Sequence, residues 1–194
     1  MDNAEKVQIE SPAELRAWLE ANYTQADGVW AVTFKKHAGE KYVSYDQVVD
    51  EIICFGWIDS LPRKLDDDRT MLWIAPRKGK GSNWSRVNKE RVERMIAAGK
   101  MHPAGQVIID QAKADGSWTA LDAIENLEIP DDLAAEFDQY DDAAANFNAF
   151  PRSAKRGILE WIFNAKRPAT RAKRIAETAR LAQDNIRANQ WRGR

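Results

Sequence analysis

Hydrophobic and polar positions follow two different periods along this chain of 194 residues. Three short runs rich in β-branched and aromatic residues, 29–34, 57–61 and 70–75, are typical of strands. Elsewhere apolar residues recur three and four positions apart, as they do on one face of an α-helix, and this spacing dominates after residue 84. The pattern predicts an α+β fold, with a small three-stranded sheet and packed helices followed by a helical C-terminal portion.

Capping signatures predict where the first helices begin. Ser11 is followed three residues later by Glu14, so the serine can cap a helix while the carboxylate reaches back toward the cap. The same spacing recurs at Ser44 and Gln47, and Gly56 is placed to end that second helix. This helix lies between the first two strands, which indicates a βαβ crossover, and the short turn before the third strand predicts an antiparallel hairpin.

The C-terminal half reads as a series of helices. The predicted ranges are 84–98, 103–114, 130–139, 142–147, 153–165 and a last helix after Pro168. The last helix should bury one apolar face made of Ile175, Ala179, Ala182 and Ile186. The segment 125–130 is the best boundary, so we expect an α+β domain at 1–127 and a helical region at 128–194 packed on it.

Charge is distributed unevenly, although the formal net charge is only −1. Residues 151–194 carry twelve basic and three acidic residues, whereas residues 114–151 carry ten acidic residues and no basic one. The basic tail can pack on its own acidic segment or bind a polyanion. The near-zero net charge favours internal packing, because nucleic-acid-binding domains usually carry an overall positive excess. Nucleic acid is therefore not an expected partner, and the sequence identifies no protein partner.

Several features indicate a cytoplasmic protein. Cys54 is the one cysteine, so no intrachain disulfide can form. The first ten residues include four charged side chains and no apolar run that resembles a signal peptide. No stretch approaches the roughly 18 apolar residues of a membrane-spanning helix. Cys54 itself stands in the apolar run 52–55, so we expect a buried, structural thiol.

Catalytic signatures are missing from the sequence. It contains no G-x-S-x-G, H-E-x-x-H, C-x-x-C or G-x-G-x-x-G motif, so no catalytic residue can be assigned. Two histidines and one cysteine are too few soft ligands to predict a zinc site. The sequence predicts neither a metal nor a cofactor.

The stretch from Trp57 to Arg91 carries the best candidate site. Arg77 directly follows the third strand, and a helix N-terminus such as the one predicted near Trp84 favours anions. Two arginines nearby could clamp a carboxylate or a phosphate. The candidate ligand-binding residues for a small anion are Trp57, Asp59, Arg77, Trp84, Ser85, Asn88 and Arg91. In the structural alternative, Asp59 pairs with Arg77 or Arg91 and the tryptophans belong to the core.

Five segments together resemble the YdeI/OmpD-associated (OmdA) family, also called bacteriocin-protection proteins. They are CFGWIDS at 54–60, PR at 76–77, SNWS at 82–85 with Asn88 and Arg91-Val92, GKMHPAG at 99–105 and AKRPATRAKRI at 165–175. The resemblance extends over nearly the whole chain. Ile74-Ala75 and Ala169 depart from it, the first at the edge of the candidate site. The resemblance implies a bacterial protein linked to bacteriocin protection and stress resistance, with no established reaction, cofactor or catalytic residue.

Three hypotheses about function follow. In the first, the chain is a binding or stress-protection protein with an anion-accepting pocket. The second is an enzyme on a small anionic or phosphorylated substrate, with Asp59 as base between Arg77 and Arg91. In the third, the basic C-terminal helix associates with nucleic acid.

Overall fold

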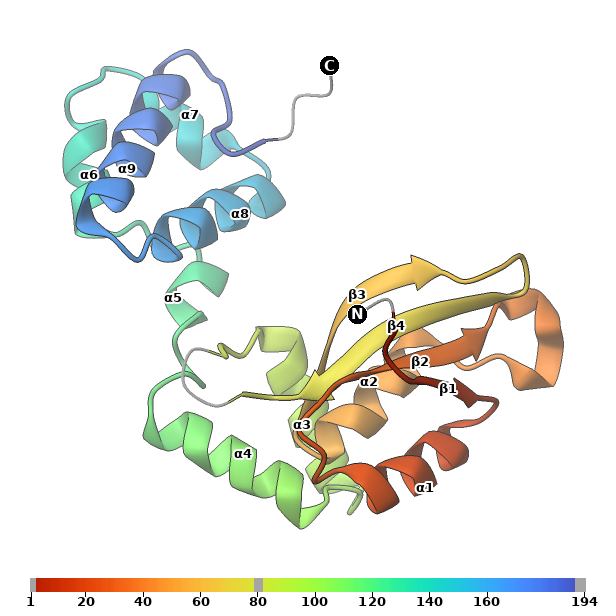
Figure 1. Cartoon of the computed structure of the whole chain (residues 1–194). Helices are drawn as coiled ribbons and strands as arrows, with labels where there is room; N and C mark the ends of the chain where they lie inside the picture. Colours follow the sequence, from red (N-terminus) through yellow and green to blue (C-terminus); the bar gives the residue numbers. More distant parts are fainter. Residues whose placement is uncertain (1–2, 79–81, 191–194) are drawn as a thin grey trace. The chain divides into compact units, whose positions relative to one another are not determined.

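The computed structural model describes residues 3–78 and 82–190. The chain divides into two compact units, residues 1–120 and residues 121–194 (Figure 1). Residues 121–127 lie in the second unit, where Leu121 and Ile124 pack into the core.

The sheet of the first unit has four strands, so the prediction of three was wrong. Its strands, in the spatial order β1-β2-β4-β3, are β1 (Lys6–Ile9), β2 (Val29–Phe34), β4 (Arg69–Pro76) and β3 (Trp57–Lys64). The unpredicted strand β1 is four residues long and buries only Ile9. Val7 and Ile9 are good strand formers and alternate with polar residues, but a run of four is too short to identify a strand by itself, and the segment pairs its backbone in parallel with β2.

The connections agree in part with the prediction. Strands β3 and β4 form the predicted antiparallel hairpin. Strand β2 is also antiparallel to β4, so β2 and β3 run parallel to each other with β4 between them. The helix α2 (Tyr45–Cys54) therefore connects two strands that do not touch, whereas α1 (Pro12–Asn22) connects the adjacent parallel strands β1 and β2. A short 3-10 helix, η1 (Lys36–Lys41), follows β2.

The predicted helix caps are present. Ser44 and Gln47 form a full capping box, and Gly56 has the left-handed φ of 74° needed after the end of α2. Ser11 caps α1, but the Glu14 carboxylate accepts from the backbone N–H of Glu10, one residue before the cap.

All six predicted helices of the C-terminal half exist, and their ends are shifted by at most two residues except at the last helix, which ends at Gln183 and does not reach Ile186. In the first unit, α3 (Arg86–Ala97) is followed by α4 (Pro103–Ala114). Helix α3 begins after its cap Ser85, so Trp84 precedes the helix instead of starting it. One short helix, α5 (Asp122–Glu125), was not predicted.

Both faces of the sheet are covered by apolar side chains. Helices α1 and α2 pack on one face, where Val29, Ala31 and Ile74 join the main core (Figure 1). On the other face Trp30, Val32 and Met71 form a smaller cluster with Leu65 and Trp73. The alternation along β2 thus places successive residues in two different apolar layers.

The second unit is a helical bundle. It consists of α5, α6 (Asp131–Phe137), α7 (Ala143–Ala149), α8 (Arg152–Phe163) and α9 (Pro168–Gln183). Helix α9 packs on α6, α7 and α8 and buries Ile175, Ala179 and Ala182, as predicted. Ile186 lies beyond the end of α9 and is exposed, because Asn185 adopts a left-handed φ of 54° and ends the helix.

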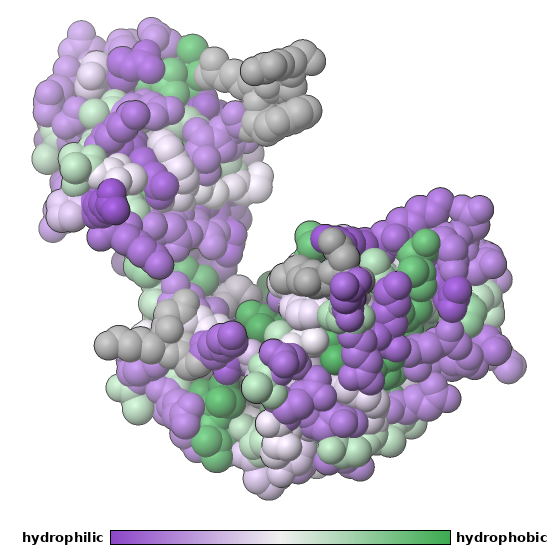
Figure 2. All heavy atoms as spheres, viewed as in Figure 1, coloured by the Kyte–Doolittle hydropathy of each residue, from purple (hydrophilic) through white to green (hydrophobic). Residues whose placement is uncertain are grey.

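Hydrophilic side chains cover most of the face drawn in Figure 2. Within the described residues, no helix combines the length and the apolar composition that crossing a bilayer requires.

Candidate functional site

Arg77 is a buried guanidinium stacked on a buried indole. Its Cζ lies 3.8 Å from the centroid of the Trp84 ring. Its backbone N–H donates to the carbonyl of Gly56 at 2.9 Å, which holds the residue to the end of α2. Its Nη1 donates to the Ser82 hydroxyl at 2.8 Å and to the Asn83 carbonyl at 3.3 Å. These neutral acceptors orient the guanidinium but do not neutralise its charge.

The Arg77–Trp84 pair retains two unpaired donors. Arg77 is only 5% exposed, and in the described part of the chain no carboxylate lies within ion-pair distance of it. Its Nε and the Nε1 of Trp84 are both buried without a hydrogen-bond partner among those residues. Burial lowers the pKa of Arg77 to about 10, and the negative charge of Asp59 acts in the opposite direction. A positive charge with free N–H donors is suited to accept an anion.

Arg91 is also buried, but its positive charge is paired with two carboxylates. Its Nη1 donates to the Asp50 carboxylate at 2.7 Å, and its Nη2 donates to the Asp46 carboxylate. Burial opposes the charged form of Arg91, but the hydrogen bonds to Asp46 and Asp50 outweigh it and raise the pKa. Arg94 completes the cluster through Asp50 at 2.9 Å. An incoming anion at Arg91 would therefore meet two carboxylates that already bind it.

Asp59 does not pair with either arginine in the described residues. Its Oδ2 accepts a hydrogen bond from the Tyr45 hydroxyl at 2.8 Å. Burial and this bond raise the pKa of Tyr45 to about 12. The alternative in which Asp59 neutralises Arg77 or Arg91 directly is thus not realised, and Asp59 acts on Arg77 only through its charge at a longer distance.

The remaining predicted site residues have structural contacts. Trp57 is 1% exposed, and its Nε1 donates to the Tyr23 carbonyl at 3.3 Å, so it belongs to the core. The Ser85 hydroxyl accepts from the backbone N–H of Asn88 at 3.4 Å and caps α3. Of the seven predicted residues, Arg77 and Trp84 are in direct contact through their side chains. Ser85 is the next residue in the chain after Trp84.

Cys54 is buried, as predicted. Its thiol donates to the Asp50 carbonyl at 3.1 Å, and burial raises its pKa to about 11. The described residues contain no group of three or more histidine, cysteine and acidic side chains that could hold a metal ion.

The carboxylate partners of Arg91 were not predicted from the sequence. Asp46 and Asp50 are four residues apart on α2, so they share one face of that helix. This spacing could have predicted that the two carboxylates lie together. It could not have predicted which arginine of a neighbouring helix they bind.

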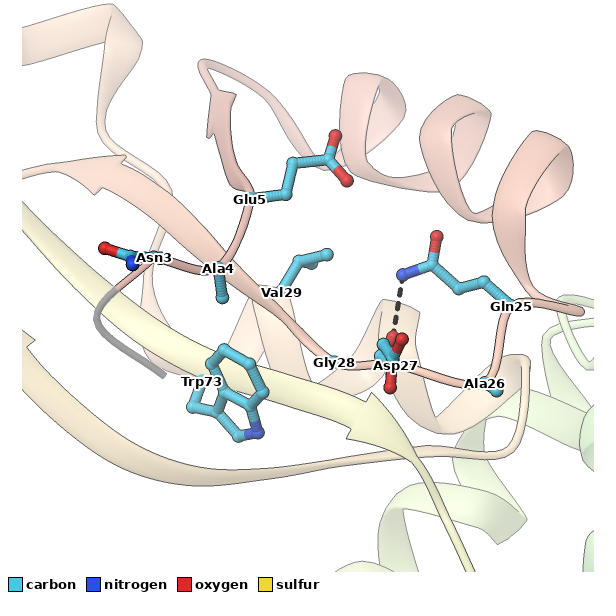
Figure 3. Close-up of a pocket in the computed structure, with 9 residues that line it drawn as sticks. All are labelled: Asn3, Ala4, Glu5, Gln25, Ala26, Asp27, Gly28, Val29 and Trp73. Carbon is cyan, nitrogen blue, oxygen red and sulfur yellow. Dashed lines mark hydrogen bonds between the residues drawn. The ribbon is translucent and has the colours of Figure 1, made fainter.

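A wide hollow of about 660 Å³ lies beside the edge of the sheet (Figure 3). Trp73 forms one wall and packs so close to Gly28 that a Cβ there would lie 2.6 Å from the indole. The carboxylates of Glu5 and Asp27 line the opening, and Gln25 donates to the Asp27 carbonyl at 2.8 Å. Its negative charges make this hollow a poor site for an anion, so it is distinct in chemistry from the Arg77–Trp84 pair.

Comparison with known families places two matches along the chain. The family model described as "Domain of unknown function (DUF8412)" matches residues 7–108, more than half of the sequence. The model described as "OmdA: Bacteriocin-protection, YdeI or OmpD-Associated" matches residues 126–185. Comparisons with curated proteins and with solved structures gave no match.

The resemblance to the OmdA family is thereby confirmed for residues 126–185, and not over nearly the whole chain as expected. The motif at 165–175 lies within the OmdA match, whereas the motifs at 54–60, 76–77, 82–92 and 99–105 lie within the DUF8412 match. The chain belongs to the DUF8412 family through its first unit, and its second unit carries an OmdA domain.

Proposed function

We propose that this protein is a cytoplasmic binding protein with a bacteriocin-protection or stress-protection role, and that it holds a small anion at Arg77 and Trp84. The OmdA match supports the role at the level of the family. The Arg77–Trp84 pair supports the chemistry of the ligand.

One observation carries the proposal, the uncompensated charge of Arg77. A buried donor that lacks an acceptor costs about 1–3 kcal/mol, and more when the group is charged. Folded proteins rarely keep such a group without a reason. An anion that accepts from Arg77 Nε and Trp84 Nε1 would satisfy both donors and neutralise the guanidinium. The free energy that these two unpaired donors cost would then be regained when the anion binds.

The described residues of the site offer donors and no nucleophile–base pair, and this favours binding over catalysis. In the nucleic-acid alternative, α9 would have to present its cations to phosphates. Its apolar face is instead buried in the second unit, and Arg171 binds the Asp132 carboxylate at 2.6 Å. This packing supports a structural role for α9.

Thermal unfolding in the presence of inorganic phosphate, sulfate or citrate tests the proposal, because a ligand of the native state raises the melting temperature. We expect at least one of these anions to raise it, and Arg77→Met to abolish that increase. Arg63→Met is the matched control, because Arg63 also stacks on a tryptophan, 5.0 Å from the Trp30 centroid, but is exposed. An equal response of the Arg77→Met variant and the wild type would refute the site.

A further inference from the structure

A second cavity, of about 360 Å³, lies at the end of the main core, between the sheet and the start of α2. Most of its lining is apolar, and its wall and floor include Phe34, Tyr42, Val43, Tyr45, Val48 and Leu72. Both tyrosines are exposed, Tyr42 by 39% and Tyr45 by 56%, although aromatic rings are normally covered. Pockets of this size with apolar walls and few polar groups are typical of small-molecule sites.

The polar part of the lining is positively charged. Lys35 and Lys36 both border the cavity. The Nζ of Lys35 donates to the backbone carbonyls of Asp66 and Asp67 at 2.9 and 2.8 Å. An ammonium group has three N–H donors, so these two bonds fix its position and leave one donor available. Lys36 is exposed and forms no ion pair with any described residue.

Within the described residues, the acidic side chains of the neighbouring turn contact other residues and form no ion pair with these lysines. Asp66 pairs with Arg69 at 2.7 Å, and Asp67 pairs with Lys64 at 2.6 Å. Asp68 lies 2.9 Å from the His37 ring nitrogen. The mouth of the cavity therefore keeps two ammonium groups without a carboxylate partner in the described part of the chain.

We infer that this cavity binds a small apolar molecule that carries one anionic head group, such as an aromatic carboxylate. The apolar body lies against Val43, Val48 and Leu72, and Tyr42 and Tyr45 flank it at the entrance. The head group accepts from Lys35 and Lys36. This site shares no residue with the Arg77–Trp84 pair, so it does not depend on the function proposed there.

Three probes with one body and different head groups test the inference by titration calorimetry on the full chain. They are 4-phenylbutyrate, 4-phenylbutan-1-ol and 4-phenylbutylamine. We expect the acid to bind at least about tenfold more tightly than the alcohol. A hydrogen bond to a charged group contributes more free energy than one between neutral groups, and the difference corresponds to about a tenfold change in Kd. The amine should bind more weakly still, because its charge repels the lysines. Equal affinities for the acid and the amine, or no binding of the acid, would overturn the inference.

Substitutions locate the binding. Lys36→Glu should weaken 4-phenylbutyrate binding at least about tenfold, by removing one cation and adding a repulsive charge. Lys36 is exposed and unpaired among the described residues, so this variant should fold normally. Lys173→Glu makes the same charge change at an exposed position of α9 and should leave the affinity unchanged. Arg77→Met should also leave it unchanged, which separates this site from the one at Trp84. Wild-type affinity in Lys36→Glu would show that the head group lies elsewhere.

Discussion

The two units of this protein differ in whether their buried polar side chains have hydrogen-bond partners. In the second unit, the nearly buried Glu125 carboxylate pairs with Arg156 at 3.0 Å, and the Thr178 hydroxyl donates to the Arg174 carbonyl at 2.8 Å. In the first unit Arg91 is matched by carboxylates, yet Arg77 and Trp84 each retain an unpaired N–H. Among the described residues, unpaired buried side-chain donors thus occur only in the first unit. The first unit therefore carries a local energetic cost at the position where we propose a ligand.

Two glycines inside helices, one in each unit, have different surroundings. Gly105 lies where α4 crosses the end of α2, and an added Cβ would be 2.1 Å from the Cys54 carbonyl oxygen. Gly157 is the interior glycine of α8, and an added Cβ would meet nothing within 4 Å. The same substitution should therefore have opposite effects in the two units.

The largest expected effect is that of Gly105→Ala. Because the obstructing atom belongs to the backbone, α4 must shift, and we expect a loss of about 3 kcal/mol in the free energy of unfolding. Gly157→Ala should raise stability by about 0.5–1 kcal/mol through helix propensity. Urea unfolding followed by circular dichroism measures both. A neutral Gly105→Ala would mean that the contact between the two helices is looser than described here.

The next effect distinguishes the two buried arginines. Arg91→Met leaves Asp46 and Asp50 without their buried cation, but the Asp46 carboxylate is 73% exposed and that of Asp50 only partly buried, so the loss should be smaller than for a fully buried pair. Asp50 keeps Arg94, so we expect a loss of about 2 kcal/mol. Arg77→Met removes a charge that has no counter-ion, so its stability should stay within about 1 kcal/mol of the wild type. Equal losses in the same unfolding assay would contradict the distinction between a structural and a ligand-binding arginine.

The smallest effect concerns the surface of the second unit. Arg171→Gln breaks the pair with Asp132, and exposed pairs contribute at most about 1 kcal/mol. The hydrogen bond from Arg171 lowers the pKa of Asp132 below its ordinary value of 3.8. A lowered carboxyl pKa adds stability above the unfolded-state pKa, and that stability is lost as the pH falls through the folded-state pKa.

The difference between wild type and Arg171→Gln should accordingly be present at neutral pH and vanish in acid. Urea unfolding at both pH values measures it, with Lys173→Gln as a control for the loss of one exposed charge on α9. A difference that persists in acid would assign the effect to packing of the arginine stem.

Local signals in the sequence were sufficient for much of the fold. The capping box at Ser44, the αL glycine at Gly56 and the hairpin of β3 and β4 all depend on residues close together in the chain. Cys54 is buried, as its apolar neighbours predicted. Most helix ends were predicted to within two residues because caps and prolines act over a single turn, whereas α9 ends at Gln183, three residues before the predicted Ile186.

Tertiary structure alone decided the rest. Strand β1 exists because β2 supplies its hydrogen bonds, and β4 separates β2 from β3 through pairings that no local pattern encodes. Arg77 and Arg91 look equivalent in sequence, yet Asp46 and Asp50 of a distant helix neutralise only Arg91. The cavity at Lys35 and Lys36 is assembled from β2, η1, α2, β3 and β4. The charge and volume of a site depend on which side chains the folded chain brings together across long sequence separations, and spacing along one segment carries no information about that.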